Sequence, residues 1–285
     1  RVKFGGHVTE RTTRAGKQIF DWVGTDDVFA MAYDTPVPGY GNRTVNNLRL
    51  WSAKATEDFD LDFFNKGDYF AATSKKTESE SISKVLYPND NSKEGRELRL
   101  KQQYFFVSAS IQDILRRFKR EHQDFRELPD AAAIQLNDTH PTIGICELMR
   151  ILIDEESLDW GQAWEITKAV FGYTNHTLLP EALEKWPISM FGRLFPRHLQ
   201  IIQEINARFL REVANRYPGD SDRLRNMSIF EEGPDPHIRM AFLAIVGSHS
   251  VNGVSALHTE LLKKNVVPDF FDLYPEKFNN KTNGI

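Results

Sequence analysis

Two short apolar segments of this 285-residue chain each end in a polar loop and are flanked by helical patterns. The first, Ala131–Leu136, ends in Asn137-Asp-Thr-His-Pro141 and precedes a helix that is expected to reach about Glu155. A helix over Trp160–Phe171 leads into the second, Gly172-Tyr-Thr-Asn-His-Thr177. Repeated strand, loop and helix units are typical of an α/β fold with a largely parallel sheet. Because ligands bind at the carboxyl ends of such strands, we expect the two loops to share one site.

The rest of the chain predicts further strands, and its second half is rich in helical patterns. Strands are expected over Val2–Val8, Asp27–Tyr33 and Val45–Trp51. Two prolines and a glycine in Asp34-Thr-Pro-Val-Pro-Gly-Tyr40 are expected to end the second strand and form a rigid loop. The apolar run Ala131–Leu136 is expected to be covered on both faces of its sheet. Helices are expected over 97–118, from 180 onward, and over 197–217, 240–247 and 251–264.

Composition disfavours several classes of partner. The formal charge of −4 offers no general attraction to nucleic acid or anionic lipid. The longest apolar stretch, Met240–Val246, is far shorter than the roughly 20 residues that a membrane helix needs. A single cysteine, Cys146, forms no internal disulfide, and no signal sequence opens the chain, so a cytoplasmic location is expected. The chain opens on Arg1 rather than methionine, so we expect it to begin within a longer protein.

The first polar loop carries hydrogen-bonding groups that suit sugar hydroxyls. Asn137, Asp138, Thr139 and His140 follow the predicted strand without a spacer. Asparagine, aspartate and threonine also cap helices, and Pro141 can open the next helix. We therefore expect Thr139 to be a cap, and we place Asp138 and His140 in the site.

Other candidate residues leave alternatives open. His176 in the second loop is interpreted as a base, a metal ligand, a hydroxyl partner or a core histidine. A zinc site is disfavoured, because no third ligand stands at a usable spacing. Glu181 and Glu184 suit the paired acids of a glycoside hydrolase, or else a solvated helical turn. Arg116 and Arg117 suit a phosphate site or a solvated helix end.

Seven segments, in order along essentially the whole chain, closely resemble the glycogen phosphorylase (α-1,4-glucan phosphorylase) family. They are Asp34-Thr-Pro-Val-Pro-Gly-Tyr40, Leu48-Arg-Leu-Trp-Ser-Ala-Lys54, Val85-Leu-Tyr-Pro-Asn-Asp-Asn91, Ile134-Gln-Leu-Asn-Asp-Thr-His-Pro141, Tyr173-Thr-Asn-His-Thr177 with Pro180-Glu-Ala-Leu-Glu184, Pro196-Arg-His-Leu-Gln200 and Asn280-Lys-Thr-Asn-Gly-Ile285. The resemblance implies an α/β fold of two Rossmann-like domains, that of a retaining glucosyltransferase of the GT-B type. Inorganic phosphate would cleave the terminal glucose of glycogen or starch to give glucose 1-phosphate.

The resemblance also implies how the chain is divided and what it lacks. Residues 1–280 would form an incomplete N-terminal domain, and residues 281–285 would start the C-terminal domain. Pyridoxal phosphate would be bound to a lysine of that second domain, outside this chain, and its phosphate group would relay the proton. The chain alone is expected to be inactive, and no residue is assigned to a metal or to the cofactor.

Carried over residue by residue, the resemblance assigns the glucose site. The backbone carbonyl of His176 would stabilise the developing charge at the anomeric carbon, and its ring would contact a glucose hydroxyl. Asn283 would bind the same sugar. Asp90 and Asn91 would lie on a mobile loop that gates the cleft. The pocket beneath the glucose would be lined by Asp138, His140 and Glu184.

Further positions match regulatory features of the family. Arg116 and Arg117 correspond to the pair that binds the phosphate of effectors, and a helix over Asn65–Ser83 corresponds to the dimer contact. Gln200, Asn206 and Glu232 remain from a glycan storage site. Ser92 departs from an aromatic residue of an inhibitor site, and three storage-site positions also depart, at Gln203, Ala207 and Pro236.

Two further hypotheses stay open at the level of sequence. One is a glucan-binding or dimerisation module without catalysis. The other is a glycoside hydrolase, which needs two carboxyls on opposite sides of the scissile bond, an arrangement that one helical turn does not readily provide. The natural polymer and the effector are left open as well.

Overall fold

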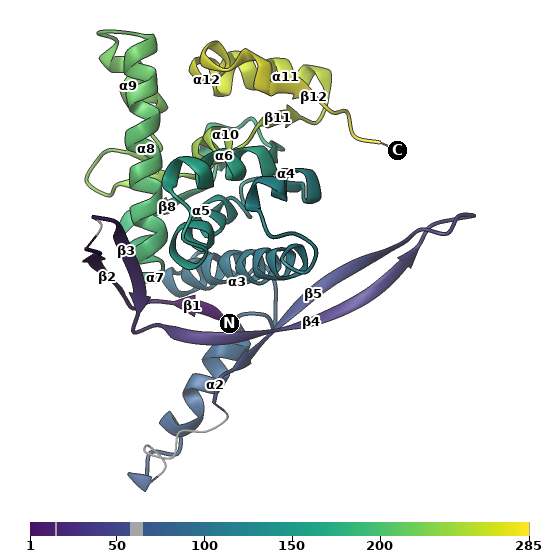
Figure 1. Cartoon of the computed structure of the whole chain (residues 1–285), viewed down its shortest axis with the longest axis vertical. Helices are drawn as coiled ribbons and strands as arrows, with labels where there is room; N and C mark the ends of the chain where they lie inside the picture. Colours follow the sequence, from purple (N-terminus) through teal and green to yellow (C-terminus); the bar gives the residue numbers. More distant parts are fainter. Residues whose placement is uncertain (15, 58–64, 285) are drawn as a thin grey trace. The chain divides into compact units, whose positions relative to one another are not determined.

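The computed structural model describes residues 1–14, 16–57 and 65–284, and these divide into two units (Figure 1). The first unit comprises Arg1–Gly5 and Gly24–Ser110, and the second comprises Gly6–Val23 and Ile111–Ile285. The long helix α3 (Lys93–Phe118) passes from one unit into the other.

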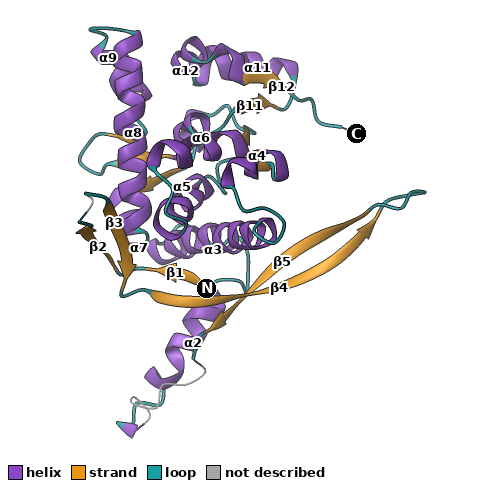
Figure 2. Ribbon diagram, viewed as in Figure 1, coloured by secondary structure: helices purple, strands orange, loops and turns teal. Residues whose placement is uncertain are grey.

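The first unit is built on an antiparallel sheet with the order β1-β4-β5. Its strands are β1 (Val2–Phe4), β4 (Asp26–Pro38) and β5 (Val45–Ala55), and β4 and β5 form a long twisted ribbon (Figure 2). The strand predicted over Val2–Val8 is interrupted at Gly5 and Gly6, which have φ values of 65° and 69°. Glycine adopts this left-handed conformation without strain, so the chain turns here and β2 begins at His7.

The prediction that the prolines end the ladder after Tyr33 is wrong. Strand β4 continues to Pro38, which lies opposite Val45. Gly39 then donates its N–H to the Thr44 carbonyl at 2.8 Å, so the N–H groups of the residues at odd positions face β5. Pro36 and Pro38 therefore direct their nitrogens to the outer edge of the ribbon, where a missing N–H breaks no hydrogen bond of the ladder.

Helices complete the first unit. Within the helix predicted over Asn65–Ser83, the structure has α2 (Ala71–Ser81), and residues 58–64 lie outside the described part. Helix α3 begins at Lys93, one turn before the predicted start. Its apolar stripe is buried, and Tyr104 packs edge-on against Phe4 of β1 with ring centroids 5.7 Å apart.

The second unit contains a parallel sheet, as the repeated strand–loop–helix pattern predicts. Its strands are β6 (Ile134–Asn137), β7 (Phe171–Thr174), β11 (Ser250–Gly253) and β12 (Phe278–Asn280), in the order β12-β11-β7-β6. Each neighbouring pair is parallel. The carboxyl ends of all four strands therefore meet at one edge of the sheet.

The other elements of this unit surround the parallel sheet or extend from it (Figures 1 and 2). The helices are α4 (Leu128–Ala131), α5 (Ile143–Arg150) with its π-helical continuation η2 (Ile151–Glu155), α6 (Trp160–Val170), α7 (Ile188–Leu194), α8 (Pro196–Arg216), α9 (Ser221–Met227), α10 (Met240–Val246), α11 (Ala256–Leu261) and α12 (Pro268–Leu273). The antiparallel strands are β2 (His7–Thr12) with β3 (Gln18–Val23), and β8 (Lys185–Pro187), β10 (His237–Arg239) and β9 (Phe230–Glu231).

Three sequence predictions for this unit are wrong. Strand β6 is an edge strand, and its Gln135 and Asn137 are exposed, so it is not covered on both faces. The helix predicted over Val251–Lys264 begins only at Ala256, because residues 250–253 form β11 and Ser255 caps the helix through its side chain. The helix predicted from Pro180 is a single turn, η3 (Pro180–Ala182), before β8.

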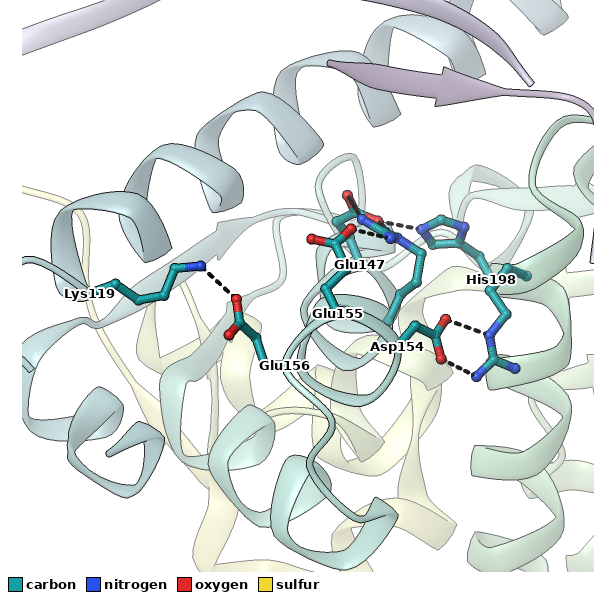
Figure 3. Close-up of polar contacts among 8 residues, drawn as sticks. Lys119, Glu147, Asp154, Glu155, Glu156 and His198 are labelled. Carbon is teal, nitrogen blue, oxygen red and sulfur yellow. Dashed lines mark hydrogen bonds and ion pairs between the residues drawn. The ribbon is translucent and has the colours of Figure 1, made fainter. Parts of the chain in front are cut away.

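A buried ionic cluster joins α5 to α8 in the second unit (Figure 3). The ring of His198 lies 2.7 Å from a carboxylate oxygen of Glu147, and both side chains are fully buried. Arg150 donates to the same carboxylate at 2.8 Å and to Glu155 at 2.7 Å. The buried charge of Glu147 is thus stabilised by hydrogen bonds from His198 and Arg150. Arg150 also bonds a second carboxylate, that of Glu155.

Burial and hydrogen bonding oppose each other in this cluster. Burial disfavours the charged form of Glu147, but Arg150 and His198 outweigh it and hold the pKa of Glu147 well below its ordinary value. Burial lowers the pKa of His198, against the opposing effect of Glu147. The stable arrangement is therefore an ionised Glu147 between a charged Arg150 and a neutral His198.

Candidate functional site

The polar loops predicted from sequence meet at the carboxyl edge of the parallel sheet. Beyond β6, Asp138 donates its N–H to the Thr174 carbonyl at 3.0 Å. Beyond β7, Asn175 donates its N–H to the Asn252 carbonyl at 2.9 Å. Backbone hydrogen bonds therefore continue past the strands and hold the loops side by side.

His176 and Asn137 form the closest side-chain contact between the two loops. The His176 Nε2 atom lies 2.6 Å from the Asn137 Oδ1 atom. Since an amide oxygen only accepts, Nε2 carries the proton in this arrangement and Nδ1 is left as an acceptor. His176 is exposed, so the imidazole is oriented by the neighbouring loop and is still accessible to a ligand.

Asp138 adopts an uncommon backbone conformation. Its φ is 64°, and its carboxylate accepts the N–H of Thr139 at 2.8 Å. Aspartate tolerates the left-handed region because its side chain bonds locally, but such a residue still stores on the order of 1 kcal/mol of strain. This local hydrogen bond therefore orients the carboxylate.

The expected capping role of Thr139 is wrong. Helix α5 starts four residues later, at Ile143, and has no side-chain cap. The buried Thr139 hydroxyl instead donates to Glu184 Oε2 at 3.2 Å. This bond brings Glu184 to the same edge, whereas Glu181 is exposed on the preceding turn. The predicted sharing of one helical face by the two glutamates is therefore wrong as well.

Asn252 of β11 is a central residue that the sequence did not reveal. Its Oδ1 accepts from the Thr174 hydroxyl at 2.9 Å, and that hydroxyl accepts from Gln135 Nε2 at 3.0 Å. The chain of contacts crosses β6, β7 and β11. A strand could have been predicted here, because Val251 is β-branched and is followed by Asn-Gly, which is typical of a strand end. The helix predicted over this region excluded that interpretation.

Behind the exposed loop side chains lies a buried polar pair. Asn175 Nδ2 donates to the Tyr173 hydroxyl at 3.0 Å, and both residues are buried. Burial raises the pKa of Tyr173, and the Asp138 and Glu184 carboxylates raise it further against the effect of Asn175. Asn175 Oδ1 is buried without a hydrogen-bond partner among the described residues. The Tyr173 phenol therefore stays neutral, and its hydrogen bond to Asn175 holds the loop that follows β7.

His258 of α11 is a second residue that the sequence did not single out. Burial lowers the pKa of His258, while the nearby His176 backbone carbonyl opposes this shift. Within the described part of the chain, neither ring nitrogen meets the geometry of a hydrogen bond. A neutral imidazole thus lies next to the residue predicted to be catalytic, and Gly253 leaves space for it, because an added Cβ would lie 2.6 Å from His258 Nδ1.

Two more predicted residues lie on segments that reach this edge. His140 is half-buried on the loop that follows Thr139. Asn283 follows β12, is exposed, and donates its N–H to the Val254 carbonyl at 3.2 Å. The backbone at Asn283 therefore runs beside the end of β11.

The predicted gate belongs to the first unit. Asn91 donates its N–H to the Asn89 side chain at 3.0 Å, and Asp90 accepts from Arg99 at 3.1 Å. Ser92 accepts the N–H of Gly95 at 3.0 Å, so the turn is tied to the start of α3.

The two arginines predicted to bind an effector phosphate share one carboxylate. Arg116 and Arg117 lie 2.6 Å and 3.2 Å from opposite oxygens of Asp113. Their side chains are more than half exposed, whereas that of Asp113 is 10% exposed. Asp113 therefore holds the two guanidinium groups close together on the surface.

The residues predicted for glycan storage have different neighbours. Gln200 donates to Glu10 of β2 at 3.3 Å. Asn206 bonds through both ends of its amide, to the Ser228 hydroxyl at 3.3 Å and to the Ile229 N–H at 2.8 Å. Glu232 is exposed just beyond β9. Six helical positions separate the two α8 residues, which is about 240° around the helix, so they lie on different faces.

Two kinds of feature are absent from the residues that the structure describes. No group of three or more His, Cys, Asp or Glu side chains is arranged to hold a metal ion. No described helix is both long and apolar enough to cross a membrane.

The parallel sheet and its helices define an α/β protein, and the hydrogen-bonding groups at the carboxyl ends of its strands make a candidate ligand site. A family model described as "Carbohydrate phosphorylase" matches residues 1–285. The chain belongs to this carbohydrate phosphorylase family, which confirms the resemblance drawn from the motifs.

Three relatives illustrate the match. A protein from Chlamydia pneumoniae named "Glycogen phosphorylase" is 54% identical over 100% of this chain and 34% of its own length. The brain form of human glycogen phosphorylase is 59% identical over 93% of this chain and 32% of its own length. The human muscle form is 56% identical over 100% of this chain and 34% of its own length. The chain thus spans about a third of the length of the curated relatives that it matches.

Proposed function

We propose that this chain is part of an α-1,4-glucan phosphorylase and supplies the glucose-binding side of its active site. The whole protein would cleave glycogen or starch with inorganic phosphate to give glucose 1-phosphate. The names of the relatives support this reaction. The observation that carries the proposal is the 2.6 Å contact between His176 and Asn137, which joins the two polar loops at one edge.

In this proposal His176 acts without transferring a proton. Its backbone carbonyl faces the anomeric carbon and stabilises the positive charge that develops as the glycosidic bond breaks. Asn137 holds the imidazole in one tautomer, so Nδ1 can accept a hydrogen bond from a glucose hydroxyl. Neighbouring His258, with its lowered pKa, adds no second positive charge beside this centre.

Other predicted residues would hold the sugar. The Asp138 carboxylate is fixed by its strained backbone, and Glu184 is fixed by the Thr139 hydroxyl. Carboxylates in defined directions are good acceptors for sugar hydroxyls. We propose that His140 and Asn283 complete the pocket. For Asp90 and Asn91, on the turn before α3 in the first unit, we propose the role of gate.

Pyridoxal phosphate, which the family implies, does not fit the described residues of this edge. The side chains that hydrogen-bond one another at this edge form three sets: Gln135, Thr174 and Asn252; Asn137 and His176; and Thr139 and Glu184. None of them is a lysine, and the ammonium of Lys281, which follows β12, donates to Asn279 instead. The cofactor is bound through an amine, so we place it on a lysine outside this chain. When bound, it would supply the acid that protonates the departing glucan oxygen, and the residues described here would bind and orient the glucose.

The remaining assignments also belong to this proposal. Arg116 and Arg117, converged by Asp113, would bind an effector phosphate. Helix α2 lies within the segment proposed for the dimer contact, and exposed Tyr69 and Phe70 precede it. Gln200, Asn206 and Glu232 would retain part of a glycan storage site. We place the protein in the cytoplasm, with no nucleic-acid or membrane partner.

The test is phosphate-dependent release of glucose 1-phosphate from glycogen. The chain should be inactive alone and active when produced with the sequence that follows it in the natural protein. In that active protein, Asn137→Leu should lower kcat by about 10-fold to 100-fold, because it releases the His176 ring. The matched substitution Asn226→Leu, at an exposed position, should leave kcat unchanged.

Three outcomes would contradict the proposal. Sugar release without phosphate would indicate a hydrolase. Glucan binding without turnover by the longer protein would indicate a binding module. Full activity in the Asn137→Leu variant would show that the edge of the sheet is not where glucose binds.

A further inference from the structure

A cavity of the second unit lies at the opposite ends of β11 and β12 from the candidate glucose site. Its volume is about 430 Å³, which is within the usual range for small-molecule sites. Ser248 and His249, which precede β11, line it, as does Lys277, which precedes β12. Helices α6 and α8 supply the other walls. The cavity is therefore separate from the strand ends that carry Asn137 and His176.

The walls of this cavity suit a flat apolar body. Trp160 and Trp164 line it from α6, and Phe209 lines it from α8. Tyr274 lies on the segment that leads to β12. Aromatic walls of this kind favour aromatic ligands through stacked and edge-to-face contacts.

Two lining residues carry buried polar atoms that lack a partner among the described residues. Ser248 is fully buried, and its Oγ makes no hydrogen bond. The Nε1 atom of Trp160 is likewise buried and unpartnered. Both groups can donate, and a buried donor without an acceptor is costly. Because both atoms have almost no accessible surface, an acceptor atom of a ligand in the cavity would bond them only once their side chains turn toward it.

Lys277 adds a positive charge without a carboxylate partner. Its ammonium donates to the Ile245 carbonyl at 3.2 Å and lies 4.2 Å from the centroid of the Tyr274 ring. Among the described residues no ion pair joins Lys277 to a carboxylate, although Glu212 and Glu276 line the same cavity. Burial lowers the pKa of Lys277, and the charge of Lys168 lowers it further, against the opposing effects of Glu212 and Glu276.

The other charged groups of the cavity are already engaged or exposed. Lys168 pairs with Glu165 at 2.9 Å, and Arg208 pairs with Glu204 at 2.6 Å. Glu212 accepts from the Tyr274 hydroxyl at 2.8 Å, and Glu276 is exposed. Lys277 is therefore the lining cation that an incoming anion can neutralise without breaking an ion pair of the described residues.

We propose that this cavity binds a small organic anion with a flat apolar body, whose carboxylate lies against Lys277 and accepts hydrogen bonds from Ser248 and Trp160. A neutral sugar would leave the charge of Lys277 uncompensated and would place hydroxyl groups against aromatic walls. An inorganic anion would make no apolar contact with the aromatic side chains of the walls. An aromatic carboxylate meets both demands. This inference does not depend on the proposed phosphorylase activity.

The test compares 2-naphthoate with its neutral analogue 2-naphthamide by isothermal titration calorimetry at pH 7. We expect the naphthoate to bind at least about 10-fold more tightly, since hydrogen bonds to charged groups are stronger than neutral ones. Lys277→Met should weaken naphthoate binding by about 10-fold and bring the two probes close together in affinity. Lys264→Met, at an exposed lysine outside the cavity, should leave both affinities unchanged.

Ser248→Ala provides an independent variant that keeps the charge and removes only one hydroxyl. It should weaken naphthoate binding by about 3-fold to 10-fold, so the proposal stays testable if Lys277→Met does not fold. No naphthoate binding at millimolar concentration would overturn the proposal. Equal affinities for the acid and the amide, or unchanged binding in the Ser248→Ala variant, would overturn it too.

Discussion

The Glu147 carboxylate depends on its neighbours for its charge. It is fully buried, and its hydrogen bonds come from Arg150 and from His198. Removing one member of a buried ion pair is far more harmful than removing an exposed pair, because the remaining charge stays buried without compensation. Arg150, whose side chain is 6% exposed, would lose this buried carboxylate and keep its bond to the exposed Glu155.

We therefore predict that Glu147→Ala lowers the free energy of unfolding by about 3–5 kcal/mol at pH 7. The pKa of Glu147 is lowered in the folded state from an ordinary value of 4.5. The contribution of Glu147 to the free energy of unfolding is thus complete above about pH 4.5 and is lost as the pH falls further. The difference in unfolding free energy between the parent and the variant should therefore shrink in acid. Urea unfolding at several pH values measures both effects.

Glu165→Ala is the matched control. Glu165 also pairs with a cation three residues away, Lys168, but its side chain is 73% exposed. Exposed pairs contribute about 0–1 kcal/mol, so this variant should unfold like the parent. Equal losses from the two substitutions would show that the buried cluster contributes no more than a surface pair.

Lys277 predicts a change of stability at alkaline pH. Its pKa is about 8 in the folded state and 10.5 ordinarily, through burial and Lys168, with Glu212 and Glu276 acting in the opposite direction. Between these values the unfolded chain binds more protons, so raising the pH stabilises the folded state. The unfolding free energy of the parent, minus that of Lys277→Met, should rise by on the order of 2 kcal/mol from pH 7.5 to pH 10.

The subtraction isolates this lysine, because the other titrating groups are common to both proteins. Lys264→Met is the control, and its difference from the parent should stay flat over the same range. A flat difference for Lys277→Met would mean that the folded protein does not disfavour the charge of Lys277.

At the scale of elements, the start of α3 is held against the turn that precedes it. A Cβ added at Gly95, in the first turn of this helix, would lie 1.8 Å from the backbone carbonyl oxygen of Asn89. No side chain can occupy that position unless the backbone of the Asn89–Asn91 turn moves. Glycine at this position is therefore a packing requirement rather than a weak helix former.

We predict that Gly95→Ala destabilises the first unit by about 1–3 kcal/mol, the usual range for a forced overlap. It should also raise hydrogen exchange at the amides of Asn91 and its neighbours. Gly161→Ala is the control at the first turn of α6, where the nearest atom to an added Cβ is a side-chain oxygen at 3.3 Å. There alanine should be neutral or stabilising by up to about 1 kcal/mol. Equal behaviour of the two variants would contradict the steric argument.

The sequence predicted those elements in which apolar periodicity and end signals indicate the same structure. The strands β6 and β7 and the helices α6, α8 and α10 have strong apolar patterns and clear ends, and the structure confirms them. The pattern failed at Pro36 and Pro38, because a proline's effect depends on which edge its nitrogen faces. It failed at Val251, because four residues carry too little periodicity to separate a buried strand from a helix.

The candidate site was predictable in its loops and less so in its connections. Asp138 and His176 stand at strand ends in the sequence, and the structure brings their loops together. Asn252 and His258 could not be found in this way, because they come from a strand and a helix far along the chain and enter through tertiary contacts. Individual roles at the site stay predictions.

At the scale of the whole molecule, the order of the chain and its division into units differ. Residues 6–23 belong with residues 111–285, although they lie between two segments of the first unit. Their hairpin, β2–β3, packs on α8, and Arg197 stacks over Phe20 at 3.8 Å from the ring centroid. The sequence cannot predict which unit this hairpin joins, because a hairpin shows the same alternation of apolar and polar residues in either unit. The predicted single domain over 1–280 stays a prediction.

The outward-facing prolines of β4 bear on how copies of the protein behave in concentrated solution. A long ribbon with exposed apolar side chains, among them Tyr33 and Leu50, is a template for recruiting a foreign strand. Proline at 36 and 38 withholds the amide donors that such a strand would need. Replacing both by valine should leave the ribbon intact but cause concentration-dependent aggregation, measurable by light scattering, whereas a monodisperse variant would show that the prolines do not guard against recruitment.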